Sequence, residues 1–200
     1  MNRRRILERV GWISLILVVW EAGRRVFAVS PLSIPAPTAV LLALVNGLVD
    51  GTLLLQVVTS LGFIVVGVVA AALMSACIVL AGSQVPAVRS FFQTLSAILH
   101  PLPGVALLPI VILWFGVGPV AVMVIVVHSV LWPLLTNFEA GYRHLSRTYR
   151  LVGRNLGLSA LGFFLRITVP ASVPFLLAGL RIAWARSWRA VISAEMIFGA

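Results

Sequence analysis

Four ionisable side chains lie in the last apolar segment of the chain, where a predicted helix would place them among apolar neighbours. They are Arg181, Arg186, Arg189 and Glu195. At about 100° per residue they occupy one side of that helix, and the other side holds the small residues Gly179, Ala183, Ala190 and Ala194. The arginines can pair with Glu195, Glu139 or backbone carbonyls at an interface, or they can line a polar path and bind an anion.

The sequence does not carry the residue patterns of several common catalytic sites. The chain has no lysine, so it cannot form the Gly-x-x-x-x-Gly-Lys-Ser/Thr loop that binds nucleotide phosphates. His100, His128 and His144 lie in separate segments without a His-Glu-x-x-His pattern, and no Gly-x-Ser-x-Gly turn occurs. We therefore predict that the chain is not an enzyme, has no catalytic residues, and binds no metal or cofactor of its own.

The elements that must position the charged residues are predicted to be membrane helices. Of the 200 residues, 61% are apolar and 10% are charged, and the mean hydropathy is +1.11, which is more apolar surface than a soluble chain of this length can bury. The net charge of +10 alone would suggest a nucleic-acid partner. However, no charged residue occurs between Ser90 and Phe138, so the arginines flank apolar spans. This pattern predicts a lipid bilayer, and not nucleic acid, as the partner.

The sequence predicts an all-α, polytopic transmembrane helical bundle in one domain, residues 1–200, with about five spans. The spans are predicted at residues 10–29, 57–81, 91–115, 119–138 and 173–198. Small residues recur in the second span at Gly62, Gly67, Ala71 and Ser75, which predicts close helix packing. The third span is interrupted at residues 100–104, where Pro101 and Pro103 are candidates for a pathway wall or simply kink the helix.

Residues 139–170 form an arginine-rich loop between the fourth and fifth predicted spans. With the N-terminus inside, the inner segments hold Arg3, Arg4, Arg5, Arg9, Arg89, Arg143, Arg147, Arg150, Arg154 and Arg166, and the outer segments hold only Arg24 and Arg25. This asymmetry fits the positive-inside rule. We therefore predict a multi-pass protein of the bacterial cytoplasmic (inner) membrane, with a cytoplasmic N-terminus and a cytoplasmic 139–170 loop.

One motif in this loop has a recognisable spacing. Residues 151–157 read Leu-Val-Gly-Arg-Asn-Leu-Gly and are followed, after nine residues, by Ile-Thr-Val-Pro at 167–170. The spacing resembles the EAA loop of binding-protein-dependent ABC importer permeases, which reads Glu-Ala-Ala, three residues, Gly, nine residues, Ile, one residue, Leu-Pro. Gly157, Ile167 and Pro170 match in register. The chain departs from the pattern at Leu151, Val152, Gly153 and Val169, and a leucine at 151 cannot make the ion pair of a glutamate.

Other blocks resemble the same family, closest to the branch that handles sulfonates, taurine, nitrate and related small organic or anionic nutrients. They are residues 32–40, 100–109, 113–118, 179–183 and 194–196. The resemblance covers nearly the whole chain. It also implies a sixth span, so the sequence is expected to be short of its natural C-terminal end.

The resemblance implies a transport subunit that works as a homodimer with two ABC ATPase subunits and an extracytoplasmic solute-binding protein. ATP and Mg²⁺ would be bound by the ATPase partner. The 139–170 loop would fold into short helices that dock on the ATPase through Arg150, Leu151, Val152, Gly153, Arg154, Gly157, Ser159, Ile167 and Pro170. Gly157 would supply the turn between two helices, Ser159 would cap the second helix, and Pro170 would end it.

The same resemblance implies transport by alternating access, with an anionic nutrient such as a sulfonate or nitrate as the solute class. Candidates for the translocation pathway are Pro101, Pro103, Arg181, Arg186, Arg189 and Glu195. The alternative is a secondary transporter, or another polytopic membrane protein that is not coupled to an ATPase, because such carriers also use broken helices and buried charges.

Overall fold

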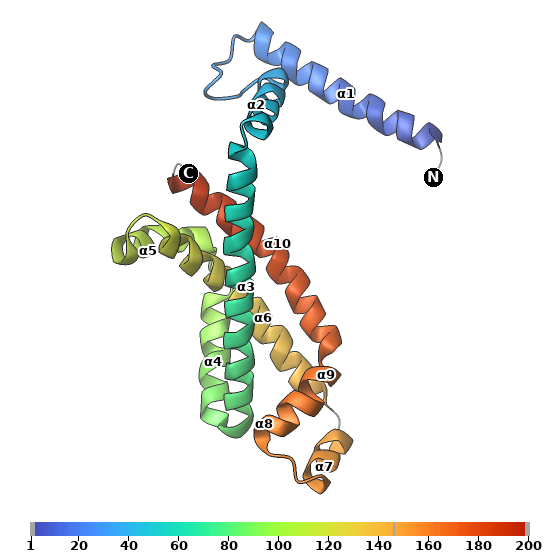
Figure 1. The fold of residues 1–200 in the computed structure, drawn as a ribbon, viewed down its shortest axis with the longest axis vertical. Helices are drawn as coiled ribbons and strands as arrows, with labels where there is room; N and C mark the ends of the chain where they lie inside the picture. Colours follow the sequence, from blue (N-terminus) through green and yellow to red (C-terminus); the bar gives the residue numbers. More distant parts are fainter. Residues whose placement is uncertain (1–2, 146, 199–200) are drawn as a thin grey trace. The chain divides into compact units, whose positions relative to one another are not determined.

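The computed structural model describes residues 3–145 and 147–198, and all regular structure in those ranges is helical (Figure 1). The α-helices are α1 (Arg3–Val26), α2 (Pro37–Val49), α3 (Thr52–Gln84), α4 (Pro86–Leu99), α5 (Leu108–Phe115), α6 (Pro119–His144), α7 (Arg147–Asn155), α8 (Ala160–Phe163), α9 (Val169–Ala171) and α10 (Val173–Phe198). A 3₁₀ turn, η1 (Gly104–Leu107), precedes α5, and a π-helical turn, η2 (Phe164–Thr168), joins α8 to α9. The predicted all-α class is confirmed.

Contacts divide the chain into two compact units, residues 1–58 and 59–200, and the division falls inside α3. In the first unit, Pro37 begins α2, at a position where the missing N–H of proline has no helical partner to lose. The Glu21 carboxylate of α1 accepts hydrogen bonds from Arg25 at 2.7 Å and from the Thr38 backbone N–H at 3.3 Å. These bonds tie the start of α2 to α1.

Two of the described helices, α3 and α6, are long and apolar enough to cross a membrane. Two bent pairs also qualify if each pair is one span: α4 with η1–α5, bent by 93°, and α8–α9 with α10, bent by 74°. The chain is therefore a polytopic helical membrane protein with two to four such spans in its described part. Every 18-residue stretch of α1 holds at least three charged residues, so the predicted span at 10–29 stays a prediction.

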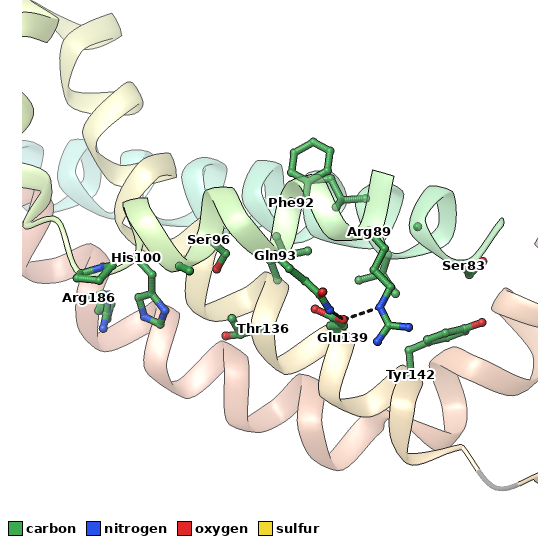
Figure 2. A pocket seen from close by; sticks show the side chains of 16 residues that line it. Ser83, Arg89, Phe92, Gln93, Ser96, His100, Thr136, Glu139, Tyr142 and Arg186 are labelled. Carbon is green, nitrogen blue, oxygen red and sulfur yellow. Dashed lines mark hydrogen bonds and ion pairs between the residues drawn. The ribbon is translucent and has the colours of Figure 1, made fainter. Parts of the chain in front are cut away.

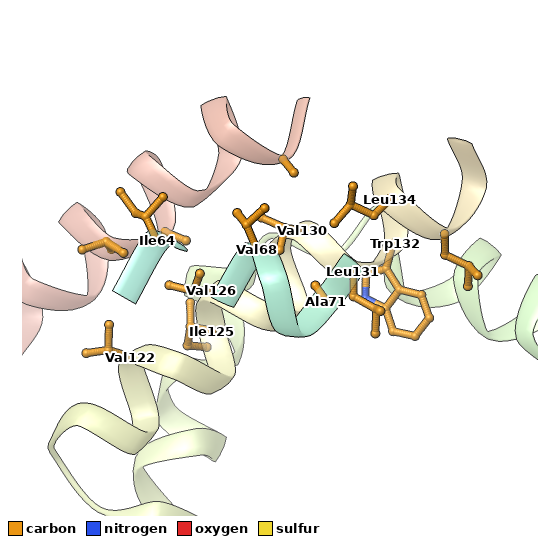
Figure 3. Close-up of a cluster of buried hydrophobic side chains, with 14 of the residues drawn as sticks. Ile64, Val68, Ala71, Val122, Ile125, Val126, Val130, Leu131, Trp132 and Leu134 are labelled. Atoms are coloured by element: carbon orange, nitrogen blue, oxygen red, sulfur yellow. The ribbon is translucent and has the colours of Figure 1, made fainter. Parts of the chain in front are cut away.

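The hydrophobic core of the second unit lies where α3, α6 and α10 pack together (Figure 3). Ile64, Ile125 and Val126 are fully buried there. A Cβ atom at Gly67 would lie 2.5 Å from Val126 Cγ1, so α3 and α6 approach this closely only because residue 67 is glycine. Gly62 is exposed, because the five-residue step from Gly62 to Gly67 rotates it about 140° away from the buried stripe.

The small face predicted for the last span packs against α6, which confirms that part of the prediction. The buried residues of α10 are Gly179, Ala183, Ser187, Ala190, Val191 and Ala194. A Cβ at Gly179 would lie 3.0 Å from Asn137 Cβ and 3.4 Å from Leu134 Cδ2. Close packing of this kind leaves the charged residues of α10 on its other sides.

The chain bends sharply between α4 and α5, at the break predicted from the prolines. Helix α4 ends at Leu99, and Pro103 is extended (φ −62°, ψ 126°) before η1 begins. The backbone at Gly104 lies against α6, because a Cβ there would be 3.4 Å from Ile125 Cγ2 and would overlap Ser129 Oγ. Only the Gly104 end of the break is covered in this way, since Pro101, Leu102 and Pro103 are exposed.

A second bend lies at Ser172 (φ −92°, ψ 0°), between α9 and α10. Gly141 of α6 lies directly against it, since a Cβ at Gly141 would be 2.7 Å from Ser172 Cβ and 3.2 Å from Phe175 Cβ. The end of α6 and the start of α10 are therefore in close contact. Between them the chain forms the excursion α7–α8–η2–α9.

Candidate functional site

The turn between α7 and α8 is built on Gly157. Its φ is +62°, a left-handed conformation that favours glycine. The Leu158 N–H donates to the Gly153 carbonyl at 3.1 Å, which is the six-to-one bond of a Schellman helix end. The structure therefore gives Gly157 the turn geometry that the sequence predicted.

Ser159 begins the next helix. It is the N-cap of α8, and its hydroxyl accepts a hydrogen bond from the Gly162 N–H at 3.1 Å. The cap predicted at this residue is present, and it fixes α8 only two residues after the turn.

Gly153 allows α7 and α8 to touch. It is buried, and a Cβ there would lie 2.7 Å from Phe163 Cε2 and 3.5 Å from Ile167 Cδ1. Three motif residues, Gly153, Gly157 and Ile167, are thus brought together in one small helical hairpin. The hairpin leaves apolar side chains exposed: Leu151, Val152, Leu156, Leu161 and Leu165. The side chains of Arg150 and Arg154, also predicted for this site, lie outside what the structure describes.

Pro170 does not end the second helix of the hairpin, which corrects the expectation from sequence. It lies within α9, and the helical path continues through η2 and α9 to the bend at Ser172. A proline inside a helix crowds the carbonyl four residues before it and lacks an N–H. The wide π turn at 164–168 directly precedes it, and π turns are where such irregularities are accommodated.

A cavity of about 480 Å³, called here the α4–α6–α10 cavity, is lined by residues of α3, α4 and α6 and by Arg186 of α10 (Figure 2). One face of α4 lines it from Arg89 to His100, a distance of about 16 Å along the helix. Its polar lining is Ser83, Arg89, Gln93, Ser96, His100, Thr136, Glu139, Tyr142 and Arg186. The cavity thus extends from the α3–α4 turn to the break that follows α4.

At one end of the cavity, polar bonds join α4 and α6. Arg89 Nε lies 2.9 Å from Glu139 Oε1, and the Gln93 amide donates to the same oxygen. The Arg89 and Glu139 side chains are 36% and 20% exposed, so solvent partly screens the pair. The carboxylate of Glu139 is therefore already occupied by a cation and an amide.

The structure separates the three arginines of α10. Arg186 is half-buried and lines the cavity, whereas Arg181 and Arg189 are exposed. Arg189 Nε donates to the Ala185 carbonyl of its own helix at 3.3 Å. The predicted pathway residues Pro101 and Arg186 thus meet at one cavity, and Arg181 and Arg189 lie outside its lining. Pro103, two residues after Pro101, is also outside the lining.

Glu195 pairs across the bundle with a hydroxyl. The Ser60 hydroxyl of α3 donates to Glu195 Oε1 at 2.6 Å. The pairing expected between Glu195 or Glu139 and Arg186 or Arg189 is not among the hydrogen bonds and ion pairs of the described residues. Ser60 binds Glu195, and Arg89 binds Glu139. Within the same residues, no group of three or more His, Cys, Asp or Glu side chains is placed to hold a metal ion.

Sequence reasoning selected the 100–104 segment, which begins at His100, but not the α4 residues of the cavity. Arg89, Gln93 and Ser96 lead to His100 at steps of four, three and four residues. A polar stripe at helical spacing in an apolar segment is the signal that could have identified them.

Comparison with known proteins places these features in a family. The model for the binding-protein-dependent transport system inner membrane component matches residues 64–200, which include both the α7–α8 hairpin and the cavity.

Three curated relatives are similar over different lengths. The taurine transport system permease protein TauC of Escherichia coli (strain K12) is 27% identical over 199 residues, covering 97% of this chain and 72% of the relative. The nitrate import permease protein NrtB of Synechocystis sp. (strain ATCC 27184 / PCC 6803 / Kazusa) is 32% identical over 197 residues, covering 94% and 70%. The bicarbonate transport system permease protein CmpB of Synechococcus elongatus (strain ATCC 33912 / PCC 7942 / FACHB-805) is 31% identical over 112 residues, covering 52% and 40%.

Proposed function

The chain belongs to the family of binding-protein-dependent transport system inner membrane components, and from that premise we propose that it imports a small anionic solute. Family membership makes it a multi-pass permease subunit of the inner membrane in an ABC importer, not a catalytic subunit. Such a permease works with an ATPase subunit, which binds ATP, and with a solute-binding protein. A secondary transporter uncoupled from an ATPase is therefore disfavoured.

The solutes for which the relatives are named support the substrate class. Taurine carries a sulfonate, and nitrate and bicarbonate are anions, so the three share a compact group of oxygens bearing negative charge. The described α4–α6–α10 cavity has two arginines in its lining against one glutamate, which favours an anion over a cation. We infer a small oxyanion or sulfonate as the solute.

The observation that carries the proposed energy coupling is the hairpin of α7 and α8. Its glycine turn and serine cap hold two short helices against each other, with Leu151, Val152 and Leu156 exposed on the outside. Exposed apolar side chains on a rigid helical hairpin are suited to bury surface in a partner's groove. We propose that this hairpin lies on the cytoplasmic side, docks on the ATPase, and drives alternating access in a homodimer of the chain.

The test is assembly with an ATPase subunit. The ATPase encoded with this chain is co-expressed, the permease is purified in detergent, and the co-purified ATPase is quantified. Gly157→Val forces a β-branched residue into φ +62°, where a non-glycine residue costs about 1–2 kcal/mol. We expect Gly157→Val to reduce co-purified ATPase several-fold.

The matched control is Gly157→Asn, because asparagine visits the left-handed region more readily than other residues with a side chain. We expect it to retain most of the ATPase. Failure of the wild-type permease to bind any ATPase would refute the proposed function, and equal recovery with Gly157→Val would refute the role of the turn.

A further inference from the structure

We propose that Arg186, His100 and Ser96 form an oxyanion-binding site inside the cavity between α4, α6 and α10. The inference rests on the proposed function, in which the solute is a small anion, and it goes further by assigning residues of this chain to bind that anion. The site would hold the oxygens of a sulfonate, nitrate or bicarbonate group. Figure 2 shows Arg186 and His100 at the end of the cavity that lies away from Arg89, with Ser96 between His100 and Gln93.

The strongest support is the environment of the Arg186 guanidinium. Arg186 lies midway along a helix of 26 residues and is half-buried. Among the described residues it makes no hydrogen bond or ion pair with an acid; Arg89 binds Glu139, and Ser60 binds Glu195. A half-buried guanidinium in an apolar helix is stabilised by a compensating anion or by water. The cavity beside it provides room for either.

The charge of the cavity supports an anion over neutral ligands. Its charged lining residues are Arg89, Glu139 and Arg186. At one end, the opposite charges of Arg89 and Glu139 cancel each other. Arg186 therefore contributes the uncompensated positive charge at the other end. The potential therefore becomes more positive along α4 from the occupied pair toward His100.

Two neutral donors line the same cavity as Arg186. Ser96 is 5% exposed and His100 begins the break after α4, and both line the cavity. A hydroxyl and an imidazole N–H can each donate to an anion's oxygen. Guanidinium with two further donors is the arrangement that binds planar or tetrahedral oxyanions at several oxygens. The cavity volume of about 480 Å³ falls in the range of small-molecule sites.

The exposed Arg189 provides a matched control for Arg186. It lies three residues further on the same helix and donates to its own helix backbone. Arg186→Gln and Arg189→Gln remove the same charge from the same helix. Only the first removes it from the cavity lining.

The experiment measures binding of ethanesulfonate to the full chain in lipid nanodiscs, by isothermal titration in a chloride-free buffer at neutral pH. Dimethyl sulfone serves as a neutral probe with similar oxygens. We expect Arg186→Gln to weaken ethanesulfonate binding about tenfold or more, His100→Ala to weaken it several-fold, and Arg189→Gln to change it less than twofold. Dimethyl sulfone should bind at least tenfold more weakly than ethanesulfonate.

The proposal is overturned if the wild-type chain binds no ethanesulfonate up to millimolar concentration, if Arg186→Gln binds as wild type, or if Arg189→Gln weakens binding equally. Gel filtration and thermal melting identify a variant that fails to fold. If Arg186→Gln fails to fold, the effect of His100→Ala on ethanesulfonate binding tests the site in its place. Co-purification of the ATPase is measured on the same variants. If the wild type does not bind the ATPase, the proposed function is refuted. If the wild type binds the ATPase and Arg186→Gln does not change ethanesulfonate binding, only the anion site is refuted.

Discussion

The α7–α8 hairpin and the α4–α6–α10 cavity use polar and apolar groups in opposite ways. In the hairpin, polar backbone groups are bonded locally by the glycine turn and the Ser159 hydroxyl, and leucines face outward. In the cavity, charged groups face inward, and one pair is bonded across helices, Arg89 on α4 with Glu139 on α6. An apolar exterior on a rigid hairpin suits a protein partner, and a polar interior with net positive charge suits a small anion.

Gly153→Val is expected to have the largest effect, and to change the hairpin without changing the cavity. The new side chain would collide with the Phe163 ring and force α7 and α8 apart, at a cost of about 1–3 kcal/mol. We expect co-purified ATPase to fall about tenfold while ethanesulfonate binding stays near wild type. The control is Gly62→Val on α3, where nothing lies within 4 Å of the added Cβ. Loss of anion binding by Gly153→Val would mean that the two regions are not independent.

A smaller effect on the hairpin is expected from Ser159→Ala. It removes the hydroxyl that accepts from the Gly162 N–H, and loss of an N-cap costs about 1 kcal/mol. We expect ATPase co-purification to fall by up to about fivefold. Ser159→Asp keeps an acceptor at the cap and should retain wild-type recovery. Equal loss in both variants would indicate that the hydroxyl contacts the partner directly and does not act through the cap.

The smallest effect is expected in the cavity, from Glu139→Gln. The substitution removes the acid that binds Arg89, and a partly exposed pair of this kind contributes about 0.2–1 kcal/mol. We expect little change in thermal stability and ethanesulfonate binding that is up to about threefold tighter, because Arg89 then adds its charge to the cavity. Asp50→Asn removes a negative charge outside the cavity lining and should leave binding unchanged. Weaker anion binding in Glu139→Gln would contradict the charge argument.

The two regions also differ in how far the sequence predicts them. The Gly157 turn and the Ser159 cap follow from residues within a few positions, since a left-handed φ and an N-cap are set by local sterics and hydrogen bonds. The small face of α10 was predictable for the same reason, from helical periodicity. The Ser60–Glu195 bond joins residues 135 positions apart, and the Arg89–Glu139 pair joins residues 50 positions apart. Helical periodicity predicts which side of its own helix a side chain lies on. It does not predict which other helix packs against that side.

Two sequence expectations were wrong because each depends on how the helix rotates over several residues. Gly62 was grouped with the stripe of Gly67, Ala71 and Ser75. It lies five residues before Gly67, and a five-residue step rotates the side-chain position by about 140° around the helix, away from that stripe. Pro170 was expected to stop a helix, but the π turn before it lets the helical path continue to Ser172. Residue type alone does not determine which side of a long helix a residue faces. It also does not determine where the pitch of the helix changes.

The close fit of Gly141 against Ser172 has a mechanical consequence. Because a side chain at residue 141 would have no room, the end of α6 supports the first turn of α10 directly. If α10 tilts as a rigid body about this contact, it acts as a lever with the residues beyond Ser172 on its long arm. Arg186 lies 14 residues beyond Ser172, about 21 Å along the lever. A tilt of about 5° at the fulcrum displaces the guanidinium by about 2 Å, enough to break a hydrogen bond to an anion.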